Sequence, residues 1–133
     1  MQMDLFKSSG ILKYGSDWRL ALEIDQQLAD YYRSLIPKWF RSQRPRWSAH
    51  VTVVRPEKEV PVNKEFWNKY KGEIINFEYS PYIHEDDYYY WINVYSTKLE
   101  EIRRELGLHM KTSFNPPVGY TKSFHCTIAN KKD

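Results

Sequence analysis

The segment SAHVTV at residues 48–53 has a close counterpart in SFHCTI at residues 123–128. Both segments carry Ser, His and Thr at alternate positions and end in an aliphatic residue. Because side chains alternate across a strand, Ser48, His50 and Thr52 share one face and apolar residues occupy the other. The two segments therefore predict two strands, each with an apolar core face and a polar face that must meet water, a ligand or a polar network.

The similarity continues outward from these strands. A shift of 71 positions aligns residues 20–35 with residues 91–106, and both stretches predict a strand that leads through a capping residue into a helix. Each half, at about 18–56 and 88–130, therefore predicts strand, helix and strand. A repeat of this length is too long for a solenoid unit, so we expect two similar lobes related by a pseudo-twofold axis. The length of 133 residues fits a single domain over residues 1–133.

Local patterns predict the elements in more detail. The N-terminal residues before Trp18 form a short polar start, and His84 and His109 fall in or near loops, where we expect them to be solvated. The expected strands cover 18–24, 47–55, 73–83, 88–95 and 120–130, and the expected helices cover 26–35, 64–71 and 97–106.

Composition limits the function classes. The net charge of +3 and the pI of about 8.9 tolerate a phosphate-bearing ligand without demanding one. The aromatic share of 17% fits either a ring-filled core or a pocket that stacks flat ligands. The single cysteine, Cys126, excludes an internal disulfide and fits a reducing compartment. Without a long apolar run or a signal peptide, we expect a cytoplasmic protein with no membrane partner.

The two polar strand faces suit chemistry at phosphorus. If the lobes bring them together, one imidazole can act as base and the other, as imidazolium, can act as acid. A Thr two residues after each His points the same way and can donate a hydrogen bond to a non-bridging phosphate oxygen. This scheme needs no metal and no cofactor, so we expect neither.

The paired motifs His50-Val51-Thr52-Val53 and His125-Cys126-Thr127-Ile128 resemble those of the two-histidine (2H) phosphoesterase superfamily, which includes the LigT-like RNA ligases and cyclic phosphodiesterases. The resemblance covers nearly the whole chain. It implies an α+β fold in which two strand-helix-strand lobes, each with an antiparallel sheet, surround a central cleft. It also implies His50 and His125 as acid and base, with Thr52 and Thr127 as phosphate ligands.

Within that superfamily, the small size and Tyr-rich N-terminal stretch look most like phage anti-CBASS phosphodiesterases. Those enzymes degrade cyclic oligonucleotide messengers of bacterial immunity, so the resemblance implies such a substrate and, for a phage-encoded protein, the host cytoplasm. It also implies that Tyr14, with Lys13 beside it, stacks on a base. Attack by a neighbouring 2′-hydroxyl would then leave a 2′,3′-cyclic phosphate end.

Four further residues are candidate substrate ligands. Trp47 and Tyr120 precede the two histidines and either stack a base or belong to the core. Arg55 and Lys122 either offset phosphate charge or are solvated surface residues. Two other functions stay open: a 2′,3′-cyclic phosphodiesterase acting on RNA ends or cyclic mononucleotides, and a non-catalytic nucleotide- or RNA-binding module. The sequence indicates no obligate protein partner.

Overall fold

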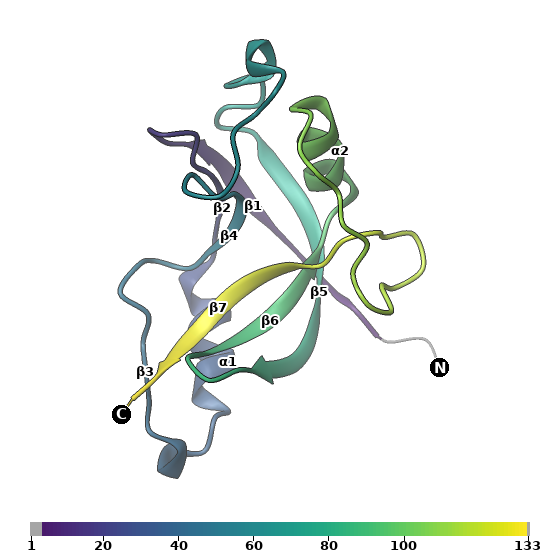
Figure 1. The fold of residues 1–133 in the computed structure, drawn as a ribbon. Coiled ribbons are helices and arrows are strands. Elements are labelled where there is room, and N and C mark those ends of the chain that lie inside the picture. Colours follow the sequence, from purple (N-terminus) through teal and green to yellow (C-terminus); the bar gives the residue numbers. More distant parts are fainter. Residues whose placement is uncertain (1–3, 133) are drawn as a thin grey trace.

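Six antiparallel strands close on themselves into a barrel in the computed structural model, which describes residues 4–132 (Figure 1). Around the barrel the order is β7–β4–β2–β1–β5–β6, and β6 pairs again with β7. A two-residue strand, β3 (Ser42–Gln43), extends the sheet beside β7. The barrel strands are β1 (Phe6–Tyr14), β2 (Leu20–Ile24), β4 (His50–Val54), β5 (Ile74–Glu85), β6 (Tyr89–Tyr95) and β7 (Phe124–Lys131).

The expected fold class, an α+β arrangement of two lobes around a cleft, is wrong. The reason is β1, which occupies the N-terminal stretch for which no strand was expected. Leu12 of β1 pairs with Leu22 of β2, and Ser8 of β1 pairs with Phe77 of β5. β1 therefore links β2 to β5, and this link makes the strands one continuous, closed sheet, so the protein is mostly β.

The barrel interior is apolar because one residue in two along each strand points inward. Leu12, Leu22, Val51, Ile92 and Ile128, from five different strands, are fully buried. Each such side chain contributes roughly 1.5–3 kcal/mol through burial. The outward positions between them are the polar positions of the two repeated segments, so core formation itself decides which face His50 and His125 occupy.

Two helices, α1 (Gln26–Ser34) and α2 (Thr97–Glu105), lie toward opposite ends of the curved sheet (Figure 1). The Asp25 and Ser96 side chains cap them by accepting backbone N–H bonds, which confirms both expected helices. The expected helix at 64–71 is wrong, because only a 3₁₀ turn, η2 (Lys64–Phe66), forms there; a second such turn is η1 (Lys38–Phe40). Within residues 4–132, no helix is long and apolar enough to cross a membrane.

Candidate active site

The two repeated strands are neighbours in the barrel. β4 and β7 run antiparallel, with Val51 directly opposite Cys126. Continued by one residue in each direction, the antiparallel register of this pair puts His50 across from Thr127 and Thr52 across from His125. The four side chains therefore form one block, with the histidines on one diagonal and the threonines on the other.

This block lies on the outer face of the barrel. Val51 and Cys126 point into the core with no exposed surface, whereas His50, Thr52 and Thr127 are half-buried and His125 is exposed. Diagonal neighbours on adjacent strands have side chains roughly 7–8 Å apart. Two imidazoles at that spacing can flank a single phosphate group.

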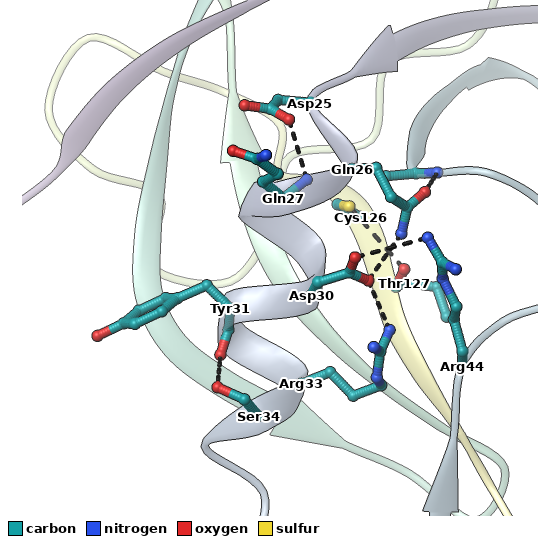
Figure 2. Close-up of polar contacts among 11 residues, drawn as sticks. Asp25, Gln26, Gln27, Asp30, Tyr31, Arg33, Ser34, Arg44, Cys126 and Thr127 are labelled. Carbon is teal, nitrogen blue, oxygen red and sulfur yellow. Dashed lines mark hydrogen bonds and ion pairs between the residues drawn. The ribbon is translucent and has the colours of Figure 1, made fainter.

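His50 is held from the α1 side. The Gln26 side chain accepts a hydrogen bond from the Ala49 backbone N–H at 2.7 Å and donates one to Asp30 at 3.0 Å (Figure 2). This fixes the start of β4, one residue before His50. The Nδ1 atom of His50 lies 2.7 Å from the Ser48 carbonyl oxygen. A carbonyl only accepts, so Nδ1 carries the hydrogen and Nε2 is the nitrogen left to exchange a proton.

His125 has a different environment. The Trp91 ring of β6 lies beside it, with the ring centroids 5.2 Å apart. Although the residue keeps a solvent-exposed part, desolvation by the surrounding protein, followed by the positive charges of Arg55 and Lys122, lowers the pKa of His125 to about 4. The imidazole is therefore neutral near pH 7, in the form that accepts a proton.

Trp91 is itself held in place by a short chain of contacts. Its Nε1–H donates to the Asn93 side-chain oxygen at 3.2 Å, and the Asn93 amide nitrogen donates to Nε2 of His84 at 3.1 Å. The His84 ring also stacks on Trp91, with the centroids 5.7 Å apart. Burial lowers the pKa of His84, which keeps this ring neutral and able to accept from Asn93. His84 is thus half-buried in β5, contrary to the solvated position expected from the sequence.

Two cavities meet at the four-residue block. A cavity of about 270 Å³ is lined by His50, and a larger one of about 840 Å³ is lined by His125 and Thr127. Thr52, together with Arg55 and Lys58, lines both. A phosphate group at Thr52 would therefore have one imidazole on each side, and the groups attached to it could extend into separate cavities.

The structure brings four of the six expected substrate ligands near the histidines. Arg55 and Lys122 line the His125 cavity, and Lys13 and Trp47 line a small cavity beside His50. Trp47 is 68% exposed, so it is available to a ligand and does not belong to the core. Lys13 forms an exposed ion pair with Glu23.

The other two, Tyr14 and Tyr120, lie elsewhere. Tyr14 packs on the edge of Trp67, and its hydroxyl accepts a hydrogen bond from the Tyr70 backbone N–H. The Tyr120 hydroxyl donates to Glu78, and burial together with that carboxylate raises the pKa of Tyr120 to about 12. Neither ring lines the cavities beside the histidines, so the structure gives no support to their stacking on a base there.

Several residues at the site were not singled out by sequence reasoning. Trp91 lies opposite Thr127 in the β6–β7 register. The sequence indicated only that Trp91 and Asn93 lie on one face of the same expected strand. Arg19 lies in the His50 cavity, Lys111 lies in the His125 cavity, and Lys58 lies in both. Lys58 and Lys111 come from loops, whose placement no periodicity predicts. Arg19 directly precedes β2 and falls inside the expected strand at 18–24, whose pattern did not single it out.

The chemistry available is that of imidazoles and hydroxyls. No group of three His, Cys, Asp or Glu side chains in residues 4–132 is arranged to hold a metal ion. Cys126 is fully buried, and this burial raises the pKa of its thiol to about 12, so the reactive thiolate does not form near neutral pH.

Comparison with known proteins gives no relative. No family model matches the chain, and neither the curated proteins nor the solved structures contain a match.

Proposed function

We propose that the protein is a metal-independent phosphodiesterase that cleaves cyclic oligonucleotides, such as the cyclic di- and trinucleotide messengers of bacterial immunity. The observation that carries the proposal is the Val51–Cys126 register, which sets His50 and His125 on one diagonal with two threonine hydroxyls between them. Paired imidazoles flanking a phosphate supply the base and the acid that an in-line displacement needs.

We base the proposed roles of the two histidines on their environments, with His125 as the base and His50 as the acid. Neutral His125 accepts the proton of the attacking 2′-hydroxyl, and the O2′–P bond forms. The P–O5′ bond breaks, and His50, as an imidazolium with hydrogens on both Nδ1 and Nε2, gives its Nε2 proton to the leaving oxygen. The hydroxyls of Thr52 and Thr127 donate hydrogen bonds to the non-bridging oxygens, where negative charge accumulates. The products are a 2′,3′-cyclic phosphate end and a free 5′-hydroxyl.

A pKa of about 4 makes His125 a weak base in the free protein. A bound phosphodiester adds a negative charge beside it and offsets the charges of Arg55 and Lys122, so the pKa rises in the complex. His125 therefore becomes a stronger base when substrate occupies the two cavities beside the four-residue block. We also place the reaction in the cytoplasm, because the lone buried thiol of Cys126 fits a reducing compartment.

A 2′,3′-cyclic phosphate is the second candidate substrate, because the same four side chains can activate water in place of a 2′-hydroxyl. The size of the His125 cavity, about three times that of the His50 cavity, favours the larger cyclic oligonucleotide. A binding module without turnover is the competing class.

A substrate panel tests the proposal. It contains cyclic di- and trinucleotides, 2′,3′-cyclic mononucleotides and RNA with a cyclic phosphate end, each incubated with EDTA and analysed by chromatography. The proposal predicts turnover of the cyclic oligonucleotides that EDTA leaves unchanged and that the His50→Ala/His125→Ala protein lacks. Binding of these ligands without any product would assign the protein to the non-catalytic class.

A further inference from the structure

The His125 cavity is richer in positive charge than catalysis at one phosphate requires. Its wall holds five basic side chains and two carboxylates. The basic residues are Arg55, Lys58, Arg103, Lys111 and Lys122. Two of these five, Arg55 and Lys58, also line the smaller His50 cavity, to which Arg19 and Glu57 add one charge of each sign. Arg103, Lys111 and Lys122 belong to the His125 cavity and not to the His50 cavity.

Both carboxylates of the wall are already engaged. Glu59 receives hydrogen bonds from the buried Arg103 guanidinium on both of its oxygens. Asp86 accepts the backbone N–H groups of Tyr88 and Tyr89 at 2.8 and 2.7 Å. Glu59 is thus paired with Arg103. Asp86 keeps its negative charge, because backbone N–H groups are neutral donors, so five positive charges face two negative ones and an excess of three remains.

The other four cations, Arg55, Lys58, Lys111 and Lys122, have no carboxylate at ion-pair distance. In the part of the chain that the structure describes, none of these four side chains forms an ion pair within 4.0 Å. Burial, followed by the charge of Arg103, lowers the pKa of Lys122, so its ammonium is held at a cost that a bound anion would relieve. Concentrated, uncompensated positive charge in a concave site attracts anionic ligands.

We infer that the His125 cavity holds a second phosphate group of the substrate, one nucleotide away from the phosphorus that is attacked, in contact with Lys111 and Lys122. This inference rests on the proposed function for the position of the first phosphate, between the two histidines. If the cavity holds a second phosphate, the protein prefers substrates with at least two phosphodiester groups. A cyclic mononucleotide fills the reacting position but leaves the second one empty.

Binding measurements test this without turnover. In the His50→Ala/His125→Ala protein, calorimetry compares cyclic di-AMP, with two phosphodiesters, with adenosine 2′,3′-cyclic phosphate, with one. Adding Lys111→Gln and Lys122→Gln should weaken cyclic di-AMP binding at least tenfold more than mononucleotide binding, because each phosphate contact to an ammonium is a charge-assisted hydrogen bond. The matched control is Lys71→Gln, since Lys71 is an exposed lysine on a turn away from the cleft and should change neither affinity.

The outcomes separate this inference from the proposed function. Equal weakening of both ligands, or no weakening of either, would overturn the second phosphate position, because the lysines would then serve the first phosphate or neither. Restored cyclic di-AMP binding in Lys111→Arg and Lys122→Arg would support it. If cyclic di-AMP binds as expected but the unaltered protein never cleaves it, the second position stands and the phosphodiesterase proposal falls.

Discussion

Val51 of β4 lies directly opposite Cys126 of β7, with both side chains fully buried in the barrel core. This apolar pair fixes the register of the two strands, and the register determines what faces outward on either side of it. His50 falls opposite Thr127 and Thr52 falls opposite His125. The arrangement of the candidate site is thus a consequence of core packing, since a slip of one residue in either strand would turn the imidazole of that strand inward.

Loss of either histidine should abolish most of the activity. His50→Ala and His125→Ala should each lower kcat on a cyclic dinucleotide by at least about 100-fold, because each removes a proton-transfer step. The double variant should lose little more than the poorer single variant, since the two groups act in one step. His109→Ala is the matched control, because His109 is exposed and lines no cavity beside the block. Losses below tenfold in both single variants would remove the acid–base assignment.

The pH dependence of kcat/KM should report the pKa of His125 in the protein without bound substrate. Because this residue must be neutral to accept a proton, kcat/KM should fall as the pH drops through about 4, well below the ordinary histidine range. The corresponding limb of kcat should lie at higher pH, because the bound phosphate raises the pKa in the complex. Steady-state kinetics from pH 3.5 to 8 on protein that circular dichroism shows to be folded measure both limbs. An acidic limb of kcat/KM, on which activity falls as the pH drops, that lay near pH 6.5 instead of about 4 would contradict the desolvated environment of His125.

Trp91 should contribute part of the desolvation that lowers the pKa of His125. Trp91→Ala removes the ring beside His125, so water reaches the imidazole and its pKa should rise toward the ordinary value for histidine. An NMR titration of the His125 ring protons measures the shift, and Trp91→Phe should retain most of the lowered value. Tyr88→Ala serves as the control, since Tyr88 is 70% exposed. An unchanged His125 pKa in Trp91→Ala would show that other groups desolvate it.

Closure of the barrel depends on a glycine. A Cβ at Gly10 of β1 would lie 2.5 Å from the Glu23 carbonyl oxygen and 2.8 Å from the Leu22 side chain, both on β2. Gly10→Ala should therefore lower the free energy of unfolding by about 1–3 kcal/mol, through strain in the strand that links β2 to β5. Gly15→Ala meets only the Arg19 side chain at ordinary contact distance and should change stability far less. Urea denaturation compares the two, and equal effects would count against a strained closure at Gly10.

The sequence predicts the individual helices and strands of this protein better than it predicts the closure of the barrel. Helices α1 and α2 carry caps and periodicity, and strands β2, β4, β5, β6 and β7 alternate clearly, so their positions were expected to within a few residues. β1 was missed because its segment, FKSSGILKY, has two serines and a glycine where a strand usually shows β-branched residues. Its pairing with β2 and β5 is a long-range property that no local pattern contains.

The candidate site likewise contains residues that local sequence patterns predict and residues that they do not. His50, Thr52, His125 and Thr127 could be named from strand alternation and the repeat alone, and the structure brings them together. Their catalytic roles stay a prediction. Lys58 and Lys111 could not be named, because they line the His125 cavity only through the geometry of their loops. Tyr14 was expected to stack on a base because of the family resemblance, but in the structure its ring packs against Trp67.

The central claim is that His50 and His125 act on the same phosphorus atom. ¹⁵N NMR of the imidazoles during titration with a 2′-deoxy cyclic dinucleotide, which lacks the attacking hydroxyl, tests it most directly. We expect the ring nitrogens of both histidines to shift together, with one dissociation constant, while His109 does not respond. If only one of the two imidazoles responds, or if they respond at different ligand concentrations, the claim is contradicted.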